Sequence, residues 1–206
     1  MVLFQNKYRV ESMRFKDWDY SSPWWYYVTI NTQKHEEWFG KVVKDKMQLN
    51  TLGQIVEEEW LKTKMIRKNI DLDCYIVMPN HFHGIIILNK NIPDEEKSHE
   101  NNVEMCRSLV ETDRSLVETR RGESLREKQN EFGKPIKNSL SVIINEFKGS
   151  VKRWANKNNH EDFFWQTRFY DRIIRNEREL FNIRRYIELN PMKWELEKGM
   201  PENIEF

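Results

Sequence analysis

Residues 71–88, DLDCYIVMPNHFHGIIIL, contain two apolar runs rich in β-branched residues, separated by Pro79 and Asn80. Two such runs around a turn signal predict a β-hairpin. His81 and His83 stand at the start of the second run. Because side chains alternate across a strand, we expect both imidazoles on one face of the sheet, about 6.6 Å apart along the strand. They could bind one divalent metal ion; two half-exposed histidines beside a turn are the ordinary alternative.

One strand and one helix are expected before this hairpin. Residues 24–32, WWYYVTINT, are rich in aromatic and β-branched residues and follow a Ser-Ser-Pro turn signal, which favours a strand. Apolar residues then recur at spacings of three and four from Leu49 to Trp60, a pattern typical of an amphipathic helix. Thr51 and Gln54 have the form of a capping box, so the helix is predicted to start at Thr51.

Three further elements are expected in the last third of the chain. A stripe of apolar residues at helical spacing predicts a helix from about Asn138 onward. Residues 163–174, FFWQTRFYDRII, are typical of a strand or an extended segment. Asn176 with Glu179 three residues later indicates a capped helix that Pro191 should end. This order of elements predicts an α+β fold in which helices pack against an antiparallel sheet.

The length of 206 residues suits a single domain, here taken as 1–206. Residues 89–134 form a polar stretch with a single aromatic residue, Phe132, and we expect a flexible insertion there. Within it, RSLVETD at 107–113 is followed by RSLVETR at 114–120. Two short copies cannot form a solenoid, so the duplication is interpreted as a tolerated change in a loop.

Charge and cysteine content limit the classes of function. The chain has 34 Lys and Arg against 33 Asp and Glu, a net charge of +1, so it lacks a uniformly basic coat. Between residues 148 and 185, however, basic residues outnumber acidic residues by ten to five, which predicts a local DNA-binding face. Two cysteines exclude a disulfide framework. With no apolar stretch near the roughly 20 residues of a membrane span, we expect a soluble, cytoplasmic protein.

A second pair of polar residues lies near the end of the chain. Tyr186 and Asn190 are four residues apart and therefore share a helical face, where a nucleophile and a metal ligand could converge. The ordinary alternatives are a core aromatic residue for Tyr186 and a helix cap for Asn190. Tyr170 is a competing nucleophile, but the residue four positions after it, Ile174, is a poor metal ligand.

Five strings along the chain together resemble a known family, the single-tyrosine transposases of the HUH (His-hydrophobe-His) superfamily. They are most similar to the REP-associated tyrosine transposases, and the resemblance covers roughly residues 7–194 apart from the insertion. The strings are DWDYSSPWWYYVTI, MPNHFHG, INEFKGSVKRWAN, FFWQTRFYDRIIRNERE and YIELNPMKW.

The resemblance implies a ferredoxin-like core and a specific chemistry. It places a divalent metal, Mg²⁺ or Mn²⁺, on His81, His83 and Asn190, and the nucleophile on Tyr186. Attack of the tyrosine on DNA would yield a 5′-phosphotyrosine and a free 3′-hydroxyl. The implied partner is single-stranded or hairpin DNA of the REP type, bound by a monomer or homodimer that is nucleoid-associated when it holds DNA.

Candidate DNA-binding residues combine positive charge with stacking surfaces. Arginines would contact phosphates and Trp165 would stack on unpaired bases, unless the aromatic ring belongs to the core and the arginines to a solvated face. The candidates are Lys148, Arg153, Trp165, Gln166, Arg168, Arg172, Arg175, Arg184 and Arg185. Two other functions stay open: a non-catalytic protein that binds DNA hairpins or single strands, and a metal-dependent hydrolase without a covalent intermediate.

Overall fold

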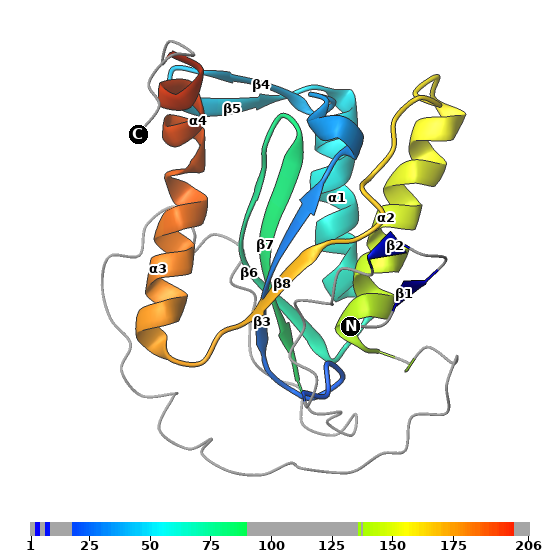
Figure 1. Ribbon diagram of the computed structural model, residues 1–206, viewed down its shortest axis with the longest axis vertical. Coiled ribbons are helices and arrows are strands. Elements are labelled where there is room, and N and C mark those ends of the chain that lie inside the picture. Colours follow the sequence, from blue (N-terminus) through cyan, green and yellow to red (C-terminus); the bar gives the residue numbers. More distant parts are fainter. Residues whose placement is uncertain (1–2, 5–6, 9–17, 90–135, 137, 200–206) are drawn as a thin grey trace.

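A computed structural model describes residues 3–4, 7–8, 18–89, 136 and 138–199 of the chain (Figure 1). The expected insertion, with its heptapeptide duplication, lies outside the described residues apart from Asn89. The strands are β1 Leu3–Phe4, β2 Lys7–Tyr8, β3 Trp25–Asn31, β4 Gly40–Val43, β5 Lys46–Leu49, β6 Ile70–Val77, β7 His81–Leu88 and β8 Tyr170–Ile173. The helices are α1 Thr51–Ile66, α2 Leu140–Lys157, α3 Glu177–Glu188 and α4 Asn190–Gly199, with a 3₁₀ turn, η1, at Gln33–His35.

The fold is α+β, as the sequence predicts, and its centre is a four-stranded antiparallel sheet in the order β6-β7-β3-β8. The predicted hairpin of residues 71–88 is confirmed as β6 and β7. Figure 1 shows α1 and α2 on one side of the sheet and α3 and α4 on the other. Within the described ranges, no helix combines the length and apolar character needed to cross a membrane.

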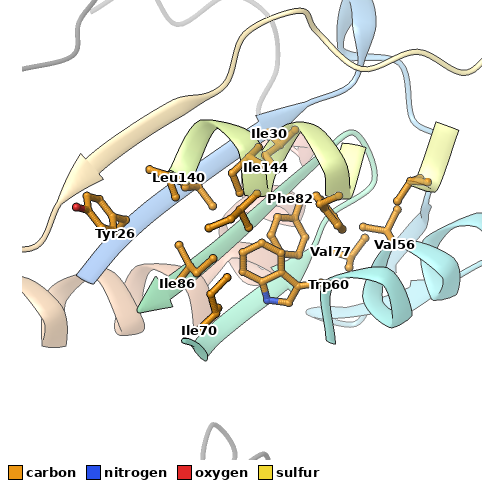
Figure 2. Packing of buried hydrophobic residues seen from close by; sticks show 14 of the residues in the cluster. Tyr26, Ile30, Val56, Trp60, Ile70, Val77, Phe82, Ile86, Leu140 and Ile144 are labelled. Atoms are coloured by element: carbon orange, nitrogen blue, oxygen red, sulfur yellow. The ribbon is translucent and has the colours of Figure 1, made fainter. Parts of the chain in front are cut away.

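The main core lies between the sheet and the pair α1 and α2 (Figure 2). Trp60 of α1 packs on Phe82 of β7, with ring centroids 4.7 Å apart, and both side chains are completely buried. A Cβ at Gly84 would lie 2.7 Å from the Trp60 ring and 2.8 Å from the Phe82 ring. The glycine that follows the two histidines is therefore required by aromatic packing on the opposite face of the sheet.

A smaller apolar cluster covers the other face of the sheet, beneath α3. It consists of Tyr27, Cys74, Ile85, Ile174 and Ile187. Side chains alternate along β7, so His81, His83 and Ile85, at every second position, all lie on this face of the sheet. The small cluster thus supports the helix that carries the candidate nucleophile, next to the candidate metal ligands.

Two helix starts agree with the predicted positions, although one cap differs. The side chain of Asn176 accepts a hydrogen bond of 2.9 Å from the Glu179 amide, as predicted for the cap of α3. Helix α1 begins at Thr51, but its cap is the preceding residue, Asn50, which accepts a 2.9 Å bond from the Gly53 amide. The Asn50 side-chain oxygen thus satisfies the free amide of Gly53 in the first turn. The prediction gave this capping role to the Thr51 hydroxyl.

Two features differ from the prediction. Pro191 does not end the helical region: α3 ends at Glu188, and the proline is the second residue of α4, where its missing N–H would have had no helical partner. Only residues 170–173 of the predicted extended segment form a strand, β8.

Candidate active site

Four predicted site residues, from β7, α3 and the start of α4, converge beneath α3. The His81 and His83 rings lie 4.6 Å apart, centroid to centroid. The Tyr186 ring meets His83 edge-on at a centroid distance of 5.3 Å. Asn190 is buried and hydrogen-bonds to His81. Strand alternation on β7 and the four-residue helical spacing at the α3–α4 junction therefore bring together the residues that the sequence singled out.

Both imidazoles are neutral at physiological pH. Burial lowers the pKa of His81 to about 4, against a smaller upward effect of the hydrogen bond with Asn190. Burial, followed by the neighbouring His81, lowers the pKa of His83 to about 3. A neutral imidazole keeps a lone pair, which is the form that binds a metal ion.

The protein holds each ring through its Nδ1 atom. His81 Nδ1 lies 2.7 Å from the Asn80 side-chain oxygen, and the Asn80 amide nitrogen in turn donates to the backbone oxygen of His35. His83 Nδ1 lies 2.7 Å from the Tyr27 hydroxyl and 2.9 Å from the Thr29 hydroxyl. His83 Nε2 is buried and has no hydrogen-bond partner among the described residues.

This arrangement fits a divalent ion that shares its coordination with the substrate. The described residues contain no group of three or more His, Cys, Asp or Glu side chains that could enclose a metal by themselves. Two imidazoles and the oxygen of Asn190 would supply three ligands, and the partnerless Nε2 of His83 is an orphan atom of the kind that a metal satisfies. Open positions would remain for oxygens of a bound substrate.

The exposure of Tyr186 distinguishes it from a core aromatic residue. Its side chain is 41% exposed, although its ring touches buried His83. The ammonium of Lys193 lies 4.9 Å from the centre of the same ring, within reach of a cation–π contact. The Tyr186 side chain is thus open to solvent while its ring contacts a proposed metal ligand.

Two predicted DNA-contact residues make contacts within the fold. The Lys148 ammonium is buried, which lowers its pKa, and it donates to the backbone oxygens of Gln166 (2.7 Å) and Thr167 (3.1 Å). The Trp165 ring packs on Phe39 and Phe163, with centroid distances of 5.1 and 5.2 Å. Lys148 therefore fastens the segment before β8 to α2, and the partly buried Trp165 packs against the core.

The predicted arginines are divided between structural ion pairs and the surface. Arg184 pairs with Asp73 of β6 at 2.5 Å, and Arg172 pairs with Glu179 at the same distance. The Arg153 guanidinium donates to the Ser150 hydroxyl. The remaining predicted arginines have exposed side chains; these are Arg168, Arg175 and Arg185.

A cleft of about 630 Å³ lies between β8 and the first half of α3. Arg172, Arg175 and Arg178 line it, together with Glu179 and Asn182 among others. The cleft therefore combines three guanidinium groups with the amides of Asn176 and Asn182 and the carboxylates of Asp171 and Glu179. Arg178 was not among the predicted DNA-binding residues.

Three polar residues at the site were not predicted. Tyr27 and Thr29 lie two positions apart on β3 and share the face of His83, a relationship that needs the register of two strands to be known. His35 Nε2 lies 3.1 Å from the side-chain nitrogen of Gln166, which places predicted residue Gln166 at the edge of the site. Strand alternation alone places Tyr27 and Thr29 on one face of β3, but it does not pair that face with His83, and nothing in the sequence relates His35 to Gln166.

Comparisons with known proteins agree with this architecture. No protein-family model matches the sequence. An uncharacterized protein of Haemophilus influenzae is 30% identical over 184 residues, which is 89% of each chain. The chain belongs to the family of that protein. Among solved structures, a REP-associated tyrosine transposase bound to a REP hairpin is similar in fold, with a TM-score of 0.51 and 16% identity. The match covers 90% of this chain and 74% of the transposase.

Proposed function

We propose that this protein is a metal-dependent single-stranded DNA transposase or endonuclease that acts at hairpin sequences through a tyrosine nucleophile. The observation that carries the proposal is the convergence of exposed Tyr186 with His81, His83 and Asn190. The similarly folded transposase, which was solved with a REP hairpin, supports DNA as the substrate class.

The proposed reaction exchanges one phosphate ester for another. The Tyr186 phenol oxygen attacks phosphorus, the bond from phosphorus to the 3′-oxygen breaks, and the phenol proton leaves as the 3′-oxygen gains one. The products are a 5′-phosphotyrosine and a free 3′-hydroxyl, so the ester is kept for rejoining rather than lost to water. A divalent ion would supply charge stabilisation at the phosphate oxygens. His81, His83 and Asn190 would hold that ion beside the phenol.

Tyr186 is favoured over Tyr170 by its neighbours. Tyr170 lies on β8, where its ring meets the edge of Tyr27 at a centroid distance of 6.4 Å. Tyr186 instead contacts His83 directly and precedes Asn190 by one helical turn. Both side chains are about equally exposed, so access does not separate them, whereas proximity to the proposed metal ligands does.

The proposed DNA-binding surface is formed by the exposed arginines around α3 and by the cleft beside β8. Arg168, Arg175 and Arg185 have exposed side chains that would meet phosphates, and Gln166 lies at the edge of the site. Arg172 is already paired with Glu179. It would contact DNA either from within that ion pair or after exchanging Glu179 for a phosphate.

Covalent attachment to DNA tests this function. A hairpin with randomised single-stranded flanks, labelled at its 3′ end, is incubated with the protein and Mn²⁺ and separated on a denaturing gel. Because the tyrosine keeps the 5′-phosphate of the downstream piece, the 3′ label should migrate with the protein, and a 5′ label should not. Tyr186→Phe should abolish the adduct, while Tyr170→Phe should retain it.

The same experiment separates the alternatives. Cleavage without attachment would indicate a metal-dependent hydrolase, and binding without cleavage would indicate a hairpin-binding protein. An adduct that survives in Tyr186→Phe and maps to a peptide containing Tyr170 would move the nucleophile to β8. His81→Ala and His83→Ala are expected to stop Mn²⁺-dependent cleavage and leave DNA binding largely intact.

A further inference from the structure

The hydroxyl groups of Tyr27 and Thr29 converge on one nitrogen of a proposed metal ligand. We propose that these two residues are positioning residues that fix the His83 ring, with Nε2 directed to the metal site. The inference rests on the proposed function, because it assigns a role to residues around the ligand set of that reaction. Neither residue touches the reacting atoms, so both would act through the imidazole.

The contacts restrain the ring in both position and rotation. His83 Nδ1 lies 2.7 Å from the Tyr27 oxygen and 2.9 Å from the Thr29 oxygen. The Tyr27 ring also stacks on the imidazole, with centroids 5.6 Å apart and planes inclined by 24°. Two hydrogen-bonding groups and a stacked ring leave the imidazole little freedom to turn away from the site.

Strand register makes this support rigid. Thr29 of β3 is the direct cross-strand partner of His83 on β7, and Tyr27 is two residues further along the same strand. All three side chains therefore lie on one face of two central, hydrogen-bonded strands. A metal ligand supported from such a frame keeps its geometry better than one supported from a loop.

The two hydroxyl contacts of His83 Nδ1 are compatible with either tautomer, and the proposal places the proton on Nδ1. Thr29 donates its hydroxyl hydrogen to the Tyr27 oxygen, 3.1 Å away. Both hydroxyl oxygens keep lone pairs that can accept the N–H of His83 Nδ1. The proton on Nδ1 leaves Nε2 with its lone pair, and Nε2 is the atom that has no partner among the described residues. Outer hydrogen bonds of this kind set the tautomer and basicity of metal-bound histidines.

Metal affinity of the full-length protein without DNA tests the proposal. The dissociation constant for Mn²⁺ is measured by electron paramagnetic resonance for wild type, Tyr27→Phe, Thr29→Val and Thr29→Ser. Loss of an outer partner typically weakens metal binding by about 10–100-fold, so we expect that range for Tyr27→Phe and Thr29→Val. Thr29→Ser keeps the hydroxyl and should bind like wild type.

The neighbouring tyrosine provides a matched control. Tyr26 is also buried and also hydrogen-bonded, but its hydroxyl lies on the other face of the sheet, bonded to Trp18 and to the backbone of Ser22. Tyr26→Phe removes the same atom from the same strand and should leave the Mn²⁺ affinity unchanged. A loss of affinity equal to that of Tyr27→Phe would show a general effect on the fold and overturn the proposal.

Nitrogen-15 NMR of the histidine side chains gives a second measurement that does not depend on activity. In metal-free wild type, His83 should carry its proton on Nδ1, and Tyr27→Phe should raise the share of the other tautomer. A proton on Nε2 in wild type, or unchanged Mn²⁺ affinity in both Tyr27→Phe and Thr29→Val, would overturn this inference while the tyrosine adduct could still form. If wild type binds no Mn²⁺, the proposed metal chemistry and the inference fail together.

Discussion

At the scale of single residues, burial explains why the two imidazoles are suited to a metal and costly to protonate. Both have a lowered pKa in the folded chain, to about 4 for His81 and about 3 for His83, against about 6.5 for an unfolded histidine. Between these values the unfolded chain binds more protons than the folded one. Protonation therefore favours unfolding, and stability should rise with pH across this window.

We predict a pH dependence of folding to which these two histidines contribute. As pH falls from about 6.5 toward 4, the free energy of unfolding should decrease by up to about 1.4 kcal/mol per pH unit for each histidine involved. His83→Gln should make the decrease shallower because it removes one of the two groups. Urea midpoints measured from pH 7 to pH 4.5 test this. Parallel profiles for the two proteins would contradict it.

Residue roles were predictable where chemistry is decided by spacing, and not where it is decided by burial. The His-x-His pair and the four-residue interval from Tyr186 to Asn190 place side chains on defined faces, and the structure brings them together. Lys148 and Trp165 lie in a basic, aromatic stretch typical of DNA contacts, yet Lys148 is buried and Trp165 is partly buried against the core. Whether such a side chain faces solvent depends on tertiary packing, which local sequence does not report.

At the scale of elements, α3 is held to the sheet by a charged pair. The Arg184 guanidinium binds Asp73 of β6 through both its Nε and Nη2 atoms, and the Asp73 side chain is only 12% exposed. Removing the arginine would leave the largely desolvated Asp73 carboxylate without a partner. The resulting loss in the free energy of unfolding exceeds the net stabilisation that the ion pair itself contributes. The ion pair therefore fixes the helix that carries Tyr186, two residues further along.

Neighbouring arginines on α3 should give opposite results when neutralised. Arg184→Gln should lower stability by about 1–3 kcal/mol, because it breaks charged hydrogen bonds to a partly buried group. Arg185→Gln, at an exposed position, should leave the melting temperature unchanged and weaken DNA binding. Thermal unfolding and fluorescence anisotropy with a hairpin measure the two effects. If Arg184→Gln weakens DNA binding at unchanged stability, Arg184 is a DNA contact and the pair is incidental.

Elements with strong local signals were predictable, and those fixed by tertiary contacts were not. Asn176 caps α3 as predicted because its side chain satisfies an amide three residues away. The β4–β5 hairpin is instead held from outside: the Asp45 amide donates to Glu195 of α4. Pro191 was expected to end the last helix, since sequence alone cannot separate a helix end from the first turn of the next helix.

At the scale of the whole molecule, a net charge of +1 limits the DNA that can bind. Long-range attraction to a duplex is weak, so affinity must come from the local arginines near α3 and from unpaired bases. We predict tighter binding to a hairpin with single-stranded flanks than to a blunt duplex of equal length, and a steep loss of affinity with salt. Anisotropy titrations at several salt concentrations measure both effects. Equal affinity for the two DNAs would contradict the prediction.

The polar segment between β7 and α2 should be dispensable for folding. Residues 92–131 contain no aromatic residue and therefore little large apolar area to bury. The flanking elements are tied down independently of it: the Asn89 amide donates to Asn69 next to β6, and the Leu140 amide donates to Tyr20 before β3. Closing a loop costs only about 0.6 kcal/mol more for each doubling of its length, so shortening this segment should change the free energy of unfolding only slightly.

A variant in which a Gly-Ser linker replaces residues 92–131 tests this directly. It should unfold in one cooperative transition with a melting temperature close to that of the full chain, and it should still form the tyrosine adduct, because every residue of the candidate site lies outside the deleted stretch. A retained fold with lost adduct would assign the segment to DNA binding or assembly. Loss of the cooperative transition would show that the segment contributes to the core, since surface loops without buried apolar contacts do not decide whether a domain folds.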